Sequence, residues 1–193
     1  MTVSQDASSF GPSAIATPAN AVTTLRLVLS PLLLALILDS GATWPAVVLW
    51  TALASTDGLD GYLARRQGTT RSGAFLDPLA DKVLVLGAMT ALVVADAMWW
   101  LPVALTFARE LAIQGFRSYW GRRGLAVPAR WSAKLKTFLQ EVAVGFALLP
   151  LTADRATWIA TTLLWVSVAV AYVSAAQYVH EGSRATRTMV GDD

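Results

Sequence analysis

The stretch DGLDGYLARRQGTTRSGAFLDPLADK, residues 57–82, carries four aspartates between two apolar segments of the chain. Asp57 and Asp60 are three residues apart, and Asp77 and Asp81 are four residues apart. Residues at these spacings share one face of an α-helix. We therefore predict two consecutive helices, antiparallel because their link is short, that each present two carboxylates. All four carboxylates can then converge on one pocket.

The composition outside this stretch is that of a membrane protein. The chain is 55% hydrophobic and 15% charged, whereas a soluble domain has about a quarter charged residues. Apolar runs recur at the roughly 20-residue length of a membrane-spanning helix. We predict an all-α polytopic membrane protein with six transmembrane helices. The expected spans are 21–40, 43–65, 74–96, 99–120, 131–151 and 156–179.

Lys and Arg residues predict the orientation of these spans. They gather near the start of the first span (Arg26), in the links at 66–73 and 121–130, near those links and in the tail, whereas the opposite links hold Asp39, Asp96, Asp154 and one cation, Arg155. Positive charge stays on the cytoplasmic side of a membrane, so both termini are expected there. The expected divisions are a flexible or interfacial N-terminal cytoplasmic segment (1–17), a six-helix domain (18–181) and a cytoplasmic tail (182–193).

Four carboxylates in a half-buried pocket repel one another and lose hydration, so they need a cation. The chain has no cysteine and one histidine. Oxygen ligands alone favour Mg²⁺, Mn²⁺ or Ca²⁺ over zinc. Two metal ions are the usual arrangement for a displacement at phosphorus. The one-sided basic surface favours anionic lipids or phosphorylated substrates as partners. Nucleic acid is not expected, because the chain has no basic soluble domain.

The aspartate stretch reads D-x-x-D-G-x-x-A-R, seven residues, then G-x-x-x-D-x-x-x-D, and it resembles the signature of the CDP-alcohol phosphotransferase family at every defined position. The segments PANAVTTLR (18–26), ARELAIQGFR (108–117) and SAKLKTFLQ (132–140) resemble one branch, the bacterial CDP-diacylglycerol–glycerol-3-phosphate 3-phosphatidyltransferases. Ala133 replaces the glycine usual in the last segment. The resemblance covers roughly residues 18 to 150.

This resemblance implies a homodimeric enzyme of the bacterial cell (inner or plasma) membrane, with a polar cavity open to the cytoplasm and with Mg²⁺ or Mn²⁺ as cofactor. It also implies that two ions are bound by Asp57, Asp60, Asp77 and Asp81, with Asp81 as the candidate general base. The CDP moiety is then expected near Gly61, Ala64, Arg65 and Gly73, and its nucleotide end near Asn20, Thr23 and Arg26.

The implied reaction moves a phosphatidyl group from CDP-diacylglycerol to an acceptor alcohol, sn-glycerol 3-phosphate in this branch, and releases CMP. A phosphorylated acceptor needs cations besides the metal ions, and the candidates are Arg109, Arg117, Lys134 and Lys136. For Arg109 an ion pair with Glu141 is the alternative. Glu110 is expected to point elsewhere, because adjacent helical residues do not share a face. Lys82 is expected to neutralise local charge.

Other acceptors remain open within the family: inositol phosphate, phosphatidylglycerol (giving cardiolipin) or serine. A divalent-cation transporter could also use the aspartates. Transporters bind near the midplane with access from both sides, and the apolar outer halves of these helices show no exit path. A purely structural membrane protein leaves the aspartate and glycine spacing unexplained.

Overall fold

The computed structural model describes residues 17–67, 71–121, 131–153 and 155–190, excluding the side chains at 18–19, 57–67, 71–78, 117, 120–121, 131–133 and 178–190. These residues form helices and turns, and no strand is found among them. The all-α prediction is therefore confirmed. The helices are α1 (Pro18–Ser40), α2 (Trp44–Gln67), α3 (Arg71–Val94), α4 (Trp100–Gly121), α5 (Trp131–Leu148), α6 (Pro150–Ala153) and α7 (Thr157–Val190).

Local sequence explains both ends of α1. The Thr17 hydroxyl accepts a hydrogen bond from the Asn20 backbone N–H at 3.1 Å, which satisfies a donor that a helix start leaves unpaired. Pro18 fits the first turn because its missing N–H is not needed there. At the other end Gly41 adopts a φ of 64° and donates to the Ile37 carbonyl, a backbone conformation that glycine adopts without steric cost.

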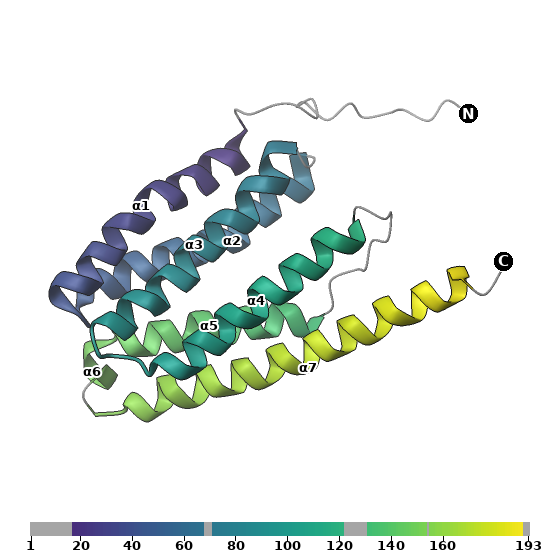
Figure 1. Cartoon of the computed structure of the whole chain (residues 1–193). Helices are drawn as coiled ribbons and strands as arrows, with labels where there is room; N and C mark the ends of the chain where they lie inside the picture. Colours follow the sequence, from purple (N-terminus) through teal and green to yellow (C-terminus); the bar gives the residue numbers. More distant parts are fainter. Residues whose placement is uncertain (1–16, 68–70, 122–130, 154, 191–193) are drawn as a thin grey trace.

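Each long helix runs antiparallel to the one before it, and the helices pack as two groups that contact each other (Figure 1). α1 packs against α2 and α3, whereas α7 packs against α4 and α5. Side chains from α1, α2, α3, α4, α5 and α7 fill the core between them. Its largest fully buried apolar members include Leu33, Ile37, Leu84, Met89, Leu92, Leu148 and Leu164.

Buried polar side chains gather at one end of the bundle. Along the inner face of α1, polar Asn20, Thr23, Arg26 and Ser30 are followed by apolar Leu33 and Ile37, all of them buried. The inner face of α5 changes in the same way beyond Gln140. We call this end the polar end: α1, α3 and α5 begin there and α2 and α4 end there (Figure 1).

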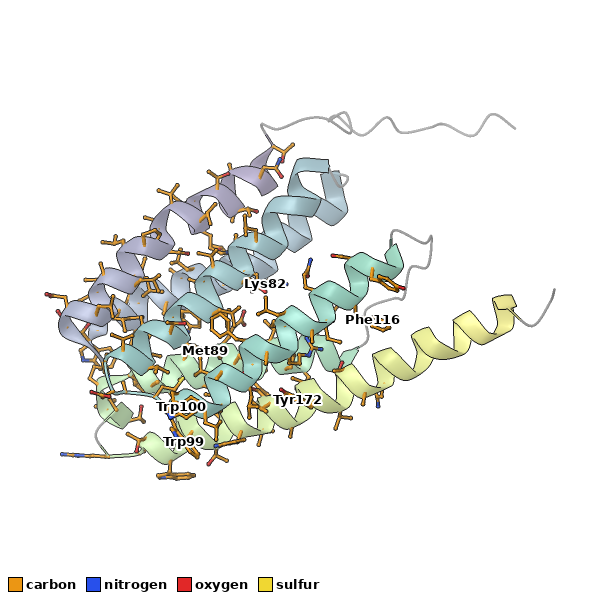
Figure 2. All side chains as sticks on the ribbon, viewed as in Figure 1. Lys82, Met89, Trp99, Trp100, Phe116 and Tyr172 are labelled. Carbon is orange, nitrogen blue, oxygen red and sulfur yellow. The ribbon has the colours of Figure 1, made fainter. Side chains whose placement is uncertain are left out.

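The opposite end carries tryptophans, and we call it the tryptophan end. Trp44, Trp99, Trp100 and Trp158 are 49–66% exposed there, beside the starts of α2, α4 and α7. Figure 2 shows Trp99 and Trp100 at this end, with Lys82 and Phe116 toward the polar end. Tryptophan is enriched where a membrane meets water, so this end has the composition of a membrane interface.

By length and composition, two of the described helices can cross a membrane, over Asn20–Ser40 and Thr157–Gln177. Among the described side chains of α2, those of Trp44–Thr56 form a shorter apolar stretch. α3, α4 and α5 carry charged residues in the halves that lie at the polar end. The six-span topology therefore stays a prediction. The predicted tail boundary at 181 falls inside α7, and the domain division also stays a prediction.

Candidate active site

The aspartate stretch lies at the polar end. Asp57 and Asp60 lie in the C-terminal half of α2, and Asp77 and Asp81 lie in the N-terminal half of α3. Asp81 is half-buried, whereas the other three side chains lie outside the described residues. Among the described side chains, no three Asp, Glu, His or Cys residues form a group that could hold a metal ion. Convergence of the four carboxylates stays a prediction.

Three predicted nucleotide-side residues are buried together on α1. Asn20, Thr23 and Arg26 are 1–4% exposed. The Arg26 Nε donates to the Thr56 hydroxyl at 3.2 Å, and Thr56 directly precedes Asp57 in α2. This hydrogen bond therefore ties the polar face of α1 to the start of the aspartate stretch. The side chains at Gly61, Ala64, Arg65 and Gly73 lie outside the described residues.

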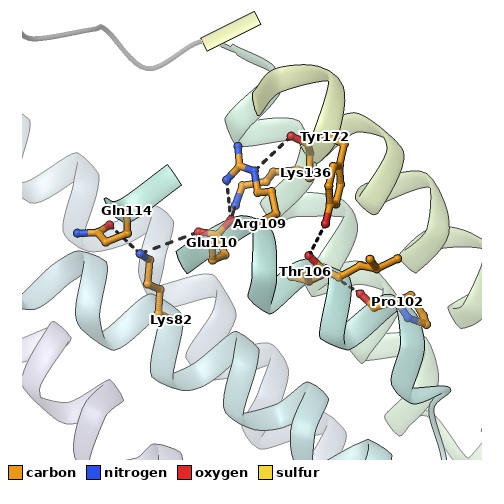
Figure 3. A network of polar contacts seen from close by, with 10 residues as sticks. Lys82, Pro102, Thr106, Arg109, Glu110, Gln114, Lys136 and Tyr172 are labelled. Carbon is orange, nitrogen blue, oxygen red and sulfur yellow. Dashed lines mark hydrogen bonds and ion pairs between the residues drawn. The ribbon is translucent and has the colours of Figure 1, made fainter. Parts of the chain in front are cut away.

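Glu110 is the centre of a charged cluster that joins α3, α4 and α5 (Figure 3). Its Oε1 forms an ion pair with Arg109 Nη1 at 2.6 Å and with Lys136 Nζ. Its Oε2 lies 4.0 Å from Lys82 Nζ, which also donates to Gln114 Oε1 at 3.0 Å. We call Lys82, Arg109, Glu110 and Lys136 the Glu110 cluster.

The Glu110 cluster holds three cations and one carboxylate, so it has an excess of positive charge. Arg109 and Lys136 are each 7% exposed, and Arg109 Nε also donates to the Ala171 carbonyl of α7 at 3.2 Å. Buried charges are stable only when they are paired and hydrogen-bonded. A cluster of this sign and burial is suited to bind an anionic group such as a phosphate.

A small cavity of about 20 Å³ adjoins this cluster. Asp81 and Val85 of α3, Glu110 of α4, and Lys136 and Gln140 of α5 are among its lining residues. The candidate general base and a buried candidate phosphate-binding cation thus face one space. The structure therefore brings Asp81 and Lys136 to one cavity, and their roles stay predictions.

The prediction that Glu110 points away from Arg109 is wrong. Arg109 pairs with Glu110 and not with Glu141. Glu141 lines a different cavity, between α2 and α5. Its backbone carbonyl oxygen accepts a hydrogen bond from Trp50 Nε1 at 3.2 Å. The prediction considered only the direction in which neighbouring helical positions point. The Arg109 and Glu110 side chains are long enough to bend toward each other.

The other predicted acceptor residues are separated by the structure. Lys134 is exposed and Lys136 is buried, because residues two apart on a helix point in different directions. The Arg117 side chain lies outside the described residues. Lys82 contacts Glu110, in keeping with its predicted role in neutralising charge.

Sequence reasoning missed two residues of this site, Glu110 and Gln140. Gln140 is the last residue of SAKLKTFLQ, one of the segments that carry the family resemblance. It follows Lys136 by four residues, a spacing that places both on one helix face. That spacing was the available signal for Gln140. Glu110 also lies in a segment that carries the family resemblance, ARELAIQGFR, but its role depends on cations from two other helices.

A family model for CDP-alcohol phosphatidyltransferase matches residues 16–173, most of the chain. The chain belongs to this family. The family resemblance carried by the aspartate signature is thereby confirmed, and the family is one of transferases. Its match spans every candidate site residue from Asn20 to Lys136.

Curated relatives agree with this assignment. A probable phosphatidylglycerophosphate synthase of Mycobacterium tuberculosis is 42% identical over 178 residues, covering 86% of this chain and 84% of the relative. A CDP-diacylglycerol–glycerol-3-phosphate 3-phosphatidyltransferase of Escherichia coli K12 is 39% identical over 135 residues, covering 66% of this chain and 74% of the relative. The names of both relatives agree with the predicted acceptor.

Proposed function

We propose that this chain transfers the phosphatidyl group of CDP-diacylglycerol to sn-glycerol 3-phosphate, forming phosphatidylglycerophosphate and CMP. The observation that carries the proposal is the buried Lys136, which lines one cavity with Asp81 and belongs to a cluster of excess positive charge. A phosphorylated acceptor needs such cations beside the general base. The names of the relatives support the same acceptor.

In this mechanism Asp81 removes the proton from the attacking hydroxyl of the acceptor. The hydroxyl oxygen then forms a bond to the phosphorus that carries the diacylglycerol, and the bond from that phosphorus to the CMP oxygen breaks. Lys136 and Arg109 hold the acceptor phosphate by charge-assisted hydrogen bonds, with the exposed Lys134 and Arg117 as further candidates. Holding both reactants in one geometry supplies much of the rate enhancement.

The donor set fits the expected Mg²⁺ or Mn²⁺, because all four ligands on α2 and α3 are carboxylates and these ions prefer oxygen. Asp57, Asp60, Asp77 and Asp81 would hold two ions. When bound, the ions would neutralise charge on the pyrophosphate of the lipid substrate. Asn20, Thr23 and Arg26 would bind the nucleotide end, with Gly61, Ala64, Arg65 and Gly73 beside the CDP phosphates.

The proposal places the enzyme in the bacterial plasma membrane with six spans and with the polar end facing the cytoplasm. Support comes from the outer surface, where large apolar side chains on α1, α2, α4, α5 and α7 are exposed, among them Val28, Val48, Leu111, Phe138 and Val173. Such a surface suits lipid contact better than water. The homodimer is proposed from the family resemblance.

Release of CMP tests the proposal. The protein, purified in detergent, receives CDP-diacylglycerol, Mg²⁺ and either glycerol 3-phosphate, inositol phosphate, phosphatidylglycerol or serine, with and without a chelator. We expect release with glycerol 3-phosphate, loss on chelation, recovery on adding Mg²⁺ or Mn²⁺, and loss in Asp81→Asn. Release with another acceptor alone would keep the family and refute the proposed acceptor.

A further inference from the structure

The side-chain amide of Gln140 is buried with an unpaired polar atom. Gln140 is 3% exposed, and its Nε2 forms no hydrogen bond with any residue that the structure describes. Leaving a buried amide donor unpaired costs free energy comparable to a lost hydrogen bond. Such a group in a native protein requires an explanation, and a ligand that supplies the missing partner is one.

The position of Gln140 indicates where that ligand binds. Gln140 lines the cavity of about 20 Å³ that Asp81, Glu110 and Lys136 also line. It lies one helical turn beyond Lys136, roughly 6 Å farther along α5 from the polar end. The cation is therefore nearer the polar end and the amide lies deeper, while Asp81 faces the same space from α3.

The size of the cavity limits what it can take. A space of about 20 Å³ holds on the order of one water molecule. It therefore fits a single hydroxyl group and excludes a whole acceptor molecule. A hydroxyl group both donates and accepts hydrogen bonds, so it can pair with the Gln140 amide while the rest of the acceptor extends toward Lys136.

We propose that Gln140 determines acceptor specificity by binding the hydroxyl group of the acceptor that does not attack phosphorus. This inference rests on the proposed function. sn-Glycerol 3-phosphate has two hydroxyl groups; Asp81 receives the proton of the attacking one, and Gln140 binds the second. An acceptor without the second hydroxyl lacks this hydrogen bond with the buried amide, and a site built around such a bond discriminates against the analogue that lacks it.

The test compares two acceptors, sn-glycerol 3-phosphate and 3-hydroxypropyl phosphate, which lacks only the second hydroxyl. We expect the wild-type enzyme to prefer the first by roughly tenfold in kcat/KM, the effect of one hydrogen bond. Gln140→Met keeps the length of the side chain and removes its hydrogen bonds, so the two kcat/KM values should become nearly equal. Because each ratio is measured within one preparation, a loss of folded protein does not change it.

Gln177→Met is the matched control, because it makes the same change at an exposed position of α7 and should keep the wild-type ratio. Gln140→Leu carries the same expectation if Gln140→Met gives too little folded protein. If Gln140→Met keeps the wild-type ratio of the two kcat/KM values, or if Gln177→Met loses it equally, the inference about Gln140 is wrong and the proposed function stands. A wild-type enzyme that uses neither acceptor overturns the proposed function and this inference with it.

Discussion

The Arg26 side chain of α1 donates a hydrogen bond from Nε to the hydroxyl of Thr56 in α2 at 3.2 Å. Arg26 is 1% exposed, and Thr56 accepts this bond while donating to the Leu53 carbonyl of its own helix at 2.6 Å. The contact fixes the buried guanidinium beside the first residue of the aspartate stretch. It therefore positions the side of the site that we assign to the nucleotide.

Replacing Thr56 with Val removes this acceptor and keeps the shape of the side chain. One hydrogen bond contributes about 1 kcal/mol, so we expect KM for CDP-diacylglycerol to rise about fivefold while KM for glycerol 3-phosphate stays unchanged. Steady-state CMP release with each substrate varied in turn measures both constants. Thr90→Val is the control, because its exposed hydroxyl bonds only within α3 among the described residues. Equal rises in both constants would assign Thr56 a general structural role.

Glu110→Gln should destabilise the protein while preserving the shape of the side chain. The change leaves Arg109 and Lys136 buried without their carboxylate, and breaking a buried ion pair costs roughly 3–5 kcal/mol. Thermal unfolding in detergent should show a clear drop in Tm. Asp39→Asn removes an exposed carboxylate at the tryptophan end and should change stability by less than about 0.5 kcal/mol.

A double variant separates this effect from a packing defect. Glu110→Gln combined with Lys136→Gln removes both charges of the pair, so its loss of stability should be smaller than the sum of the two single losses. Residues in direct contact show such non-additivity. Additive losses would mean that the interaction between Glu110 and Lys136 does not contribute to the stability of the protein.

The helices could be predicted from the sequence because apolar runs of membrane-spanning length are separated by polar links. The predicted segment 99–120 and α4 (Trp100–Gly121) differ by one residue at each end. The predicted segment 131–151 is instead divided between α5 and α6. Pro150 begins α6, because proline cannot donate the backbone hydrogen bond that would continue α5. α7 runs to Val190, beyond the apolar residues from which its end was predicted.

The charged part of the site was less predictable. The three polar residues buried on α1, Asn20, Thr23 and Arg26, follow from the segment that carries the family resemblance. The Glu110 cluster does not, because it depends on which faces of α3, α4 and α5 meet in space. A single sequence shows that Lys134 and Lys136 lie at the start of a helix, and only the packing shows that Lys136 is the buried one.

Lys136→Met should therefore impair acceptor binding far more than Lys134→Met. Truncating a buried, hydrogen-bonded charge that contacts an anionic partner costs at least 2 kcal/mol, so we expect KM for glycerol 3-phosphate to rise about 30-fold in Lys136→Met. KM for CDP-diacylglycerol should change little. Inorganic phosphate should also inhibit this variant less than the wild type. Equal effects of the two substitutions would place the acceptor phosphate nearer the water than the Glu110 cluster.

The orientation of the bundle can be tested directly because the chain contains no cysteine. Ser40→Cys places one thiol at the tryptophan end, and Tyr119→Cys places one at the polar end; both positions are exposed. A membrane-impermeant maleimide should label Ser40→Cys in spheroplasts and Tyr119→Cys in inside-out vesicles, because positive charge stays on the cytoplasmic side. CMP release by each variant shows that the labelled protein is folded. Labelling of both thiols from the same side would refute the proposed topology, since the tryptophan end and the polar end would then lie on one side of the membrane.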